Sequence, residues 1–472
     1  MSVQLSVCMI VRNESHNLEA ALRSVRDVAD EVIVVDTGST DDTCAIAIEW
    51  GARLFHDPWD DDFSKARNAA LEAASGDWVL SLDADERLAA GQQLALRELL
   101  QQPLDAYFVQ VHSAVTERSN QRTFVHLYPR LFRRDPRIRY CRRVHEQISE
   151  ALEAMRARTA ATRIRIDHEG YAASAEVRMQ KLHRNLRLLR LEENGRSDDP
   201  AVHFHLGETL ALLGDAASAV THYQRCLTIG GLPHDHHAAA HQNLASAHLA
   251  LGRWADAVAS AERALECEPA LRTPLLIRAS ARVRMQEFDA AIADVDHYLR
   301  PERPETSLTF GFELDRAKAL LVRAESNLRA QRVAEAGLDA AKLLRSKPDW
   351  GAAQRLMSRI CAAKGEPGAE LQYMERACAL EPDNEMSWKE LVAMHVRRQD
   401  LDGAQRCVER ALFHKRTAAL LRLRAWLRFQ RQDVDGALES LRDALHVEPQ
   451  HADTRARIAE LERLAQRIGE RT

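Results

Sequence analysis

The segment WVLSLDADERL, from Trp78 to Leu88, ends a short apolar run with three carboxylates. Asp and Glu are poor strand formers and are costly to bury without partners. Asp83 and Asp85 stand at i and i+2 and can therefore point oxygen ligands into one pocket, which suits Mg²⁺ or Mn²⁺ bridging to a substrate diphosphate. In the alternative, Asp83 or Asp85 caps a following helix and Glu86 favours the dipole of that helix. This segment alone leaves both interpretations open.

Around this segment, the first 170 residues alternate strand-like and helix-like stretches. Leu5–Val11, Glu31–Val35 and Trp78–Leu82 are apolar runs of the kind that form strands covered on both faces. Helical spacing appears between them, first over residues 13–28. The alternation predicts an α/β fold with a largely parallel sheet, in which ligands bind beyond the carboxyl ends of the strands. The motifs VRNE, DTGSTDD and DADE all stand at those ends.

Two further motifs add polar groups to this edge. Asp36 ends the second strand, where a carboxylate can accept a hydrogen bond from a base or a ribose, while Ser39 or Thr40 can serve as the N-cap of the next helix. Arg67 follows an acidic, aromatic loop on a predicted helix. Its guanidinium can clamp a diphosphate through two hydrogen bonds, or it can form a surface ion pair with a neighbouring aspartate (Asp61 or Asp62).

From about residue 200 the chain becomes a series of Ala-, Leu- and Arg-rich helix pairs. The segments LGDAASAV, LGRWADAV, MQEFDAAI, AQRVAEAG, KGEPGAEL, RQDLDGAQ and RQDVDGAL each put a turn before a helix with an alanine at one place. Most neighbouring alanines are about 33 to 35 residues apart, the tetratricopeptide period, which predicts an all-α solenoid. Longer gaps predict insertions near GGLPHDHH and RPERPETS. The aligned alanines are Ala219, Ala257, Ala291, Ala336, Ala369, Ala404 and Ala437.

The predicted organisation is an α/β domain over residues 1–171, a linker helix over 172–199 and the solenoid over 200–472. Residues 172–194 are basic and amphipathic, so a membrane-surface helix is the alternative to a linker. Balanced charge, with 65 basic and 70 acidic residues, argues against a nucleic-acid partner. Eight scattered cysteines fit a reducing compartment, and no apolar stretch reaches the length of a membrane helix, so we expect a cytoplasmic protein with at most peripheral membrane contact.

The order CMIVRNE, VVDTGSTDDT, PWDDDFSKARN and WVLSLDADE, followed by repeats, resembles family-2 glycosyltransferases of the GT-A fold. Within that family the chain is similar to lipooligosaccharide glycosyltransferases and to the peptide S-glycosyltransferases that modify bacteriocins. The resemblance covers essentially the whole chain, and the catalytic assignment rests on its first third. It implies a Rossmann-like nucleotide-sugar domain and a metal-dependent inverting transfer, with a UDP-sugar as donor and Mn²⁺ or Mg²⁺ as cofactor.

The resemblance also implies roles for residues that border the donor. Val11, Asn13 and Glu14 would lie along the nucleotide, and Asp36 would recognise uracil or ribose. Arg67 would lie near the diphosphate. These five residues form the expected nucleotide side of the site.

A second group carries the expected metal and catalytic roles. Asp85 would ligate the metal, and Asp83 would approach the ribose or the metal. The motif RRVHEQI supplies His145 as a metal or phosphate contact and Glu146 as the base that takes the acceptor's proton. Glu86 is the rival base, and the sequence does not separate the two glutamates.

The solenoid is expected to hold a glycan, lipid-linked or peptide/protein acceptor, or to form a homodimer, because concave repeat surfaces suit extended partners. The alternative function is a non-catalytic tetratricopeptide adaptor whose front domain is a degenerate glycosyltransferase. A nucleotidyltransferase is disfavoured because VRNESHN lacks glycine. Four histidines that stand near Gly230 and Gly231 are not expected to form a metal site, since we place them in an insertion: His234, His236, His237 and His241.

Overall fold

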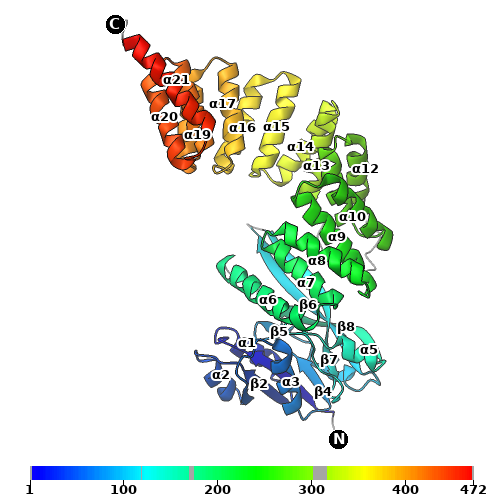
Figure 1. Ribbon diagram of the computed structural model, residues 1–472. Coiled ribbons are helices and arrows are strands. Elements are labelled where there is room, and N and C mark those ends of the chain that lie inside the picture. The colour runs from blue at the N-terminus through cyan, green and yellow to red at the C-terminus, as the bar shows by residue number, and fades with distance from the viewer. Residues whose placement is uncertain (1–2, 118–119, 169–174, 301–315, 470–472) are drawn as a thin grey trace. The chain divides into compact units, whose positions relative to one another are not determined.

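The computed structural model describes residues 3–117, 120–168, 175–300 and 316–469 (Figure 1). The chain divides into two compact units. The first contains the α/β domain and continues through helices up to Ala281, and the second contains residues 282–300 and the helices from residue 316 onward. None of the helices in the described ranges is long and apolar enough to cross a membrane.

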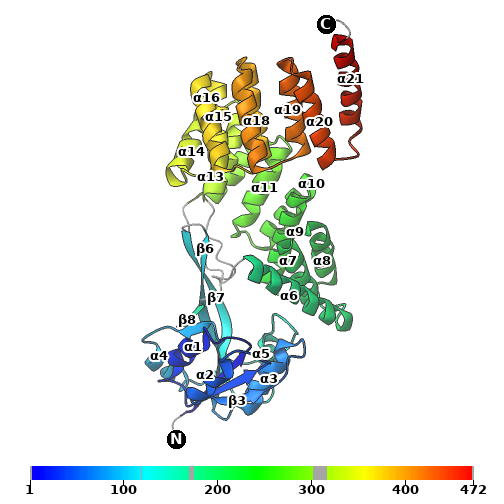
Figure 2. The ribbon, with the colours of Figure 1, turned by 90° about the vertical axis from the view of Figure 1, so that its left-hand side faces the viewer.

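The α/β domain is built on one eight-stranded sheet with the order β3-β2-β1-β4-β7-β6-β8-β5. The first four strands of this order are parallel, as predicted. The other half is mixed, because β7 runs antiparallel to β4 and β6, and β5 runs antiparallel to β8. Figure 2 shows β6 and β7 as a long twisted hairpin. The strands are β1 Leu5–Val11, β2 Glu31–Asp36, β3 Arg53–His56, β4 Trp78–Ser81, β5 Glu86–Leu88, β6 Ala106–Glu117, β7 Asn120–Arg133 and β8 Thr159–His168.

Helices cover both faces of the sheet, as the continuous apolar strands require. One side of β1 packs with helix α1, and the other side packs with helix α3 through Cys8 and Ala70. Helix α1 is shorter than the predicted 13–28, and Asn13, with a left-handed φ of 55°, lies outside it. The helices of this domain are α1 Leu18–Val25, α2 Thr43–Glu49, α3 Phe63–Ala73, α4 Gln93–Leu99 and α5 Ser149–Ala154.

The segment after β4 decides between the two interpretations of its acids. Glu86 begins strand β5 rather than a helix, and its amide donates to the carbonyl oxygen of Asp83 at 3.0 Å to close a turn. No helix follows that Asp83 or Asp85 could cap, since α4 begins only at Gln93. The helix-capping interpretation is therefore wrong, and the carboxylates are left at the strand end.

Beyond the domain, helix α6 (Ala175–Gly195) leads into the repeats. The insertion predicted at GGLPHDHH corresponds to the short connection before α9 and to the first turn of that helix, so His237 and His241 are helical rather than in a loop. RPERPETS lies outside the described residues. The repeat helices are α7 Pro200–Leu212, α8 Ala216–Ile229, α9 His234–Ala250, α10 Trp254–Cys267, α11 Thr273–Arg284, α12 Phe288–Tyr298, α13 Arg316–Arg329, α14 Val333–Ser346, α15 Gly351–Lys364, α16 Pro367–Leu380, α17 Glu385–Arg397, α18 Leu401–His414, α19 Ala418–Gln430, α20 Val434–Val447 and α21 Ala452–Gly469.

Each repeated motif contains one left-handed residue at its turn, five positions before the residue that packs between the paired helices. At that packing position six of the aligned alanines have no exposed surface. The predicted Ala369 is only half-buried and lies one position before the packing position, which Glu370 occupies after the turn at Gly365. The left-handed residues are Gly214, Gly252, Gln286, Gln331, Gly365, Gln399 and Gln432, the glutamines with φ between 60° and 65°.

Candidate functional site

The carboxyl ends of β1, β2 and β4 meet at one edge of the sheet, because these strands are parallel neighbours. Val11 pairs in register with Asp36, and the Val11 carbonyl oxygen accepts hydrogen bonds from the amide and the hydroxyl of Thr37 at 3.0 and 3.1 Å. Val11 is buried, so it can border a ligand only through its backbone. The edge is thus held rigidly at the point where the predicted nucleotide residues begin.

The loops after β1 and β2 are joined by side-chain hydrogen bonds. Ser39 Oγ accepts from the amide of Asn13 at 2.9 Å, and Asn13 Oδ1 accepts from the amide of Thr40 at 2.8 Å. These bonds fix the left-handed conformation of Asn13. Neither Ser39 nor Thr40 is the N-cap of α2, a position that Asp42 occupies, so the capping interpretation of these two residues is wrong.

Asp36 is buried and holds the turn that follows it. Its carboxylate accepts from the amides of Gly38 at 3.1 Å and Ser39 at 3.0 Å, and His56 Nδ1 lies 3.4 Å away. Burial raises the pKa of Asp36, but these hydrogen bonds outweigh it and lower the pKa below its ordinary value. The carboxylate is therefore a stable anion at the strand end.

The acids after β4 belong to a network of buried charges. Arg67 donates from Nη2 to Asp83 Oδ1 at 2.8 Å, and Arg130 donates from Nη2 to Asp83 Oδ2 at 3.0 Å. Arg130 also donates to Glu86 Oε1 at 2.9 Å, while Glu86 Oε2 accepts from the amide of Asp83 at 2.9 Å. Burial alone raises the pKa of Asp83, but the two guanidinium groups reverse this and lower it. Each carboxylate oxygen in this network has a charged or amide partner.

Arg67 joins a third carboxylate, that of Glu146, to the network. It donates from Nε to Glu146 Oε1 at 2.7 Å and from Nη1 to Ser81 Oγ at 3.4 Å, and its guanidinium lies 5.5 Å from the centre of the Tyr140 ring. The arginine is buried, so the alternative of a surface ion pair with Asp61 or Asp62 is wrong. Glu146 is thereby brought beside Asp83 although 63 residues separate them in sequence.

Asp85 points in a different direction from Asp83. Its Oδ2 lies 3.2 Å from Nε2 of His168, at the end of β8, and Ser113 Oγ lies 3.0 Å from Nδ1 of the same ring. Asp85 Oδ1 has no hydrogen-bond partner among the described residues. Glu14 lies close enough for the charges of Asp85 and Asp83 to raise its pKa, although burial is the larger cause. The carboxylates of Asp85 and Glu14 and the imidazole of His168 thus gather at one place.

His145 is held away from these acids. Its φ of 57° is left-handed, and its ring stacks on that of His205 of α7, with ring centres 4.2 Å apart and planes 14° apart. Among the described residues, His145 forms no hydrogen bond or ion pair with Asp83 or Asp85. The preceding residue, Val144, packs with Leu188 of α6 and neighbouring residues. The His-Glu pair therefore separates, with Glu146 in the site and His145 against the first repeat.

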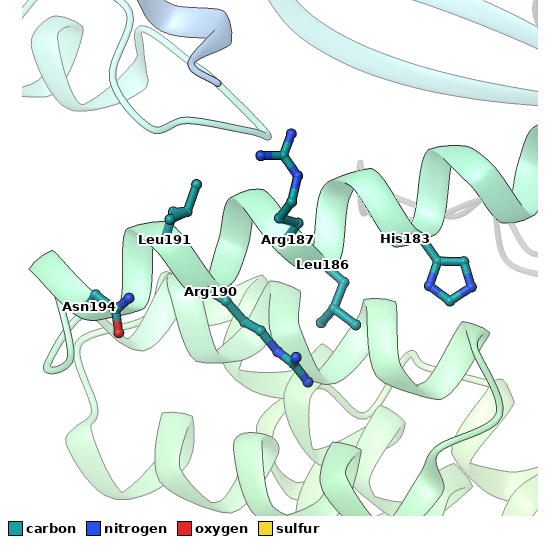
Figure 3. Close-up of a pocket in the computed structure, with 6 residues that line it drawn as sticks. All are labelled: His183, Leu186, Arg187, Arg190, Leu191 and Asn194. Atoms are coloured by element: carbon teal, nitrogen blue, oxygen red, sulfur yellow. The ribbon is translucent and has the colours of Figure 1, made fainter. Parts of the chain in front are cut away.

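Helix α6 adds positive charge beside the site. The charge of Lys181 acts on Glu14, that of Arg184 acts on Glu146, and Arg187 forms an ion pair with Asp61. In Figure 3, Arg187 and Arg190 project to different sides of this helix. The same helix lines a pocket of about 330 Å³, formed by His183, Leu186, Arg187, Arg190, Leu191 and Asn194.

The sequence did not point to Arg130, His168 or the basic residues of α6. Arg130 lies in the strand segment YPRLF, and His168 in DHEGY, neither of which has a recognisable spacing to the acids it contacts. A buried-charge argument offers the only signal, because the acids at the strand end need cationic partners. That argument does not say which of the many arginines supplies them.

Comparison with known proteins matches residues 6–158 to the model of glycosyl transferase family 2 and residues 198–267 to a tetratricopeptide repeat model. A TPR repeat-containing protein of Synechococcus elongatus is 40% identical over 225 residues, which are 46% of this chain and 54% of that protein. The prophage-derived glycosyltransferase SunS of Bacillus subtilis is 28% identical over 231 residues, 46% of this chain and 52% of SunS.

An uncharacterized glycosyltransferase of Rickettsia conorii is 42% identical over 88 residues, 19% of this chain and 31% of that protein. The chain thus spans about half the length of the first two relatives and about a third of the last. It combines a family-2 glycosyltransferase domain with tetratricopeptide repeats.

Proposed function

We propose that this family-2 domain makes the protein a metal-dependent, inverting glycosyltransferase that uses a UDP-sugar as donor. The observation that carries the proposal is the gathering of Glu14, Asp36 and Asp85 at the ends of β1, β2 and β4, where parallel sheets bind ligands. The named glycosyltransferases among the relatives support the same class of reaction.

For the donor, the loops after β1 and β2 would hold the nucleoside between Asn13 and Asp36. Both are fixed by hydrogen bonds before any ligand arrives, so little ordering is needed on binding. Arg67 has all of its nitrogens bonded to protein oxygens, so we assign it the positioning of Asp83 and Glu146. Lys181 and Arg184 on α6 then become the cations that face the diphosphate.

A divalent metal fits the residues around Asp85. Its Oδ1 has no protein hydrogen-bond partner in the described part of the chain, and carboxylate oxygens are the ligands that Mg²⁺ and Mn²⁺ prefer. His168 would complete the protein ligands in place of His145, and Asp83 is held by two arginines. When bound, the metal would neutralise negative charge on the leaving diphosphate.

The chain's own groups then supply the proton transfer. The acceptor's nucleophilic atom forms a bond to the anomeric carbon while the bond from that carbon to the diphosphate oxygen breaks, and that oxygen keeps the electron pair. We assign the acceptor's proton to Glu146, whose side chain is 13% exposed. Glu86 is only 3% exposed and bonded at both oxygens, so it acts in positioning Asp83.

The acceptor would be a glycan, a lipid-linked glycan, or a peptide or protein. We propose that the repeats bind this acceptor or join two copies of the chain, since repeat solenoids present extended surfaces to partners. Residues of α6 and α7 already contact the catalytic loop at Val144 and His145, so the first repeat borders the site.

The test is release of UDP from a panel of UDP-sugars, with and without Mn²⁺, for the wild type, Asp85→Asn and Asp27→Asn. Asp27 is exposed and remote from the strand ends, which makes it the matched control. We expect metal-dependent release that Asp85→Asn abolishes and Asp27→Asn retains. Release that ignores metal and survives Asp85→Asn would contradict the assignment. If no UDP-sugar turns over and calorimetry detects no binding of UDP with Mn²⁺, the adaptor function replaces the enzyme.

A further inference from the structure

Three side chains that commonly bind metals meet where α6 joins the first repeat. Glu193 comes from α6, His203 from α7 and His222 from α8. Nδ1 of His203 lies 3.1 Å from Nδ1 of His222, and Oε1 of Glu193 lies 3.6 and 3.9 Å from these two nitrogens. Each helix thus contributes one ligand atom to a single small triangle.

The hydrogen bonding of His203 leaves the correct atom available. Its Nε2 lies 2.9 Å from the carbonyl oxygen of Ser197, which can only accept, so Nε2 carries the hydrogen and Nδ1 of the neutral ring carries a lone pair. A ring nitrogen that donates to a backbone carbonyl while the other faces the metal is the usual arrangement of histidine ligands.

The size of the triangle fits a metal ion. A triangle with sides of 3.1, 3.6 and 3.9 Å has a circumradius of about 2.1 Å, the length of zinc bonds to nitrogen and oxygen. Two imidazoles and one carboxylate form a ligand set found in zinc sites that keep a position open for water. We propose that Glu193, His203 and His222 form a zinc-binding site that ties α6 to the first repeat.

The proposal does not depend on the glycosyltransferase assignment, because the triangle shares no residue with the strand-end site. It has one direct competitor, in which Nδ1 of His222 carries a hydrogen and donates it to His203 with no metal present. A second group of possible ligands, His237, His241 and Cys267, lies on α9 and α10. A substitution in that group is the control that shows which of the two groups binds the metal.

The experiment uses the full chain, stripped of metal, titrated with Co²⁺ in the absence of nucleotide. Co²⁺ with four or five ligands absorbs visible light much more strongly than the six-coordinate aqueous ion, so the band reports the site directly. His222→Gln is the main variant because that ring is less buried than the ring of His203, and Glu193→Gln is a second variant that keeps the shape of the side chain. Cys267→Ser is the control, and circular dichroism checks that every variant is folded.

We expect a band at one equivalent of Co²⁺ that Zn²⁺ displaces. His222→Gln and Glu193→Gln should each weaken binding by about tenfold or more, since the loss of a group that only supports a ligand already costs 10- to 100-fold. Cys267→Ser should titrate as the wild type does. Absence of the band in the wild type, its survival in both folded ligand variants, or its loss in Cys267→Ser would overturn the proposal.

Discussion

The α/β domain and the repeats both bury ion pairs, but over very different distances along the chain. In the α/β domain, Arg67 pairs with Glu146, 79 residues away, and Arg130 pairs with Glu86, 44 residues away. In the second unit, Arg323 of α13 pairs with Asp339 of α14, 16 residues away, and with Asp296 of α12, 27 residues away. The charges of Arg67 and Arg130 therefore depend partly on distant segments of the chain, whereas the charge of Arg323 depends only on the helices before and after its own.

Removal of the central arginine of the domain should have the largest effect. Arg67→Met leaves Asp83 and Glu146 without this cation, and breaking a buried pair in this way costs about 3 to 5 kcal/mol. We expect that loss in urea denaturation, together with loss of UDP release. Lys65→Met on the same helix is the control, because Lys65 is exposed and its ion pair with Asp60 is screened by solvent, so little change in stability is expected. Equal effects of the two substitutions would contradict the role of Arg67.

A second substitution tests a charge that supports the domain from outside the site. Glu31 accepts hydrogen bonds from Ser6, Ser75 and Arg53, which outweigh burial and lower its pKa from 4.5 to about 2. Glu31→Gln should cost about 2 to 3 kcal/mol at pH 7. Because the folded pKa lies below the unfolded one, this contribution is complete above pH 4.5 and disappears as the pH falls toward 2.

The measurement is the difference in unfolding free energy between the wild type and Glu31→Gln at pH 7 and at about pH 3. Exposed Glu49→Gln supplies the control, with no change expected at either pH. A difference that stays constant or grows on acidification would show that Glu31 does not stabilise the domain as an anion.

The corresponding change in the repeats should be smaller and should leave the reaction intact. Arg323→Met removes the main partner of Asp339, but that carboxylate keeps Lys342 at 3.7 Å. We expect a loss of about 1 to 3 kcal/mol with UDP release unchanged. If this variant remained folded but lost UDP release, the ion pair in the repeats would not be independent of the α/β domain, which would contradict the comparison.

The smallest predicted effect concerns the close packing of paired helices. A Cβ added at Gly207 of α7 would lie 2.6 Å from the Tyr223 ring of α8, so Gly207→Ala should cost about 1 kcal/mol after its gain in helix propensity. Gly368→Ala in α16 is the matched control, since its Cβ would meet nothing within 4 Å. Thermal unfolding should separate the two, and a stabilised Gly207→Ala would show that the helices have room to move apart.

The sequence predicted those features that are encoded by neighbouring residues. Strand and helix alternation, the position of Asp36 and Asp85 after strands, and the repeat period all follow from short-range patterns, and the structure contains each of them. Ala369 is the exception among the aligned alanines. In KGEPGAEL the packing position is set by its distance from the turn residue Gly365 and not by the nearest alanine.

The sequence could not predict which distant residues meet. Arg130 reaches Asp83 only because β7 returns antiparallel beside β4, and His168 reaches Asp85 only because β8 ends near that turn. The sequence predicts His145 as a metal or phosphate contact, but its left-handed backbone places the ring against His205. Pairing across a sheet and a single backbone angle decide these contacts, and neither is visible as a motif.

The turn residues of the repeats have one more consequence. Four of the seven turns carry an exposed glutamine in the left-handed conformation, where three others carry glycine. A side chain in this conformation costs about 1 kcal/mol that glycine avoids, part of which is offset because glycine is more disordered when unfolded. Replacement of these four glutamines by glycine would therefore stabilise the array at positions outside its core. The stability of single repeats can thus be changed at their turns, by mutation or by design, without a change in the packing between helices.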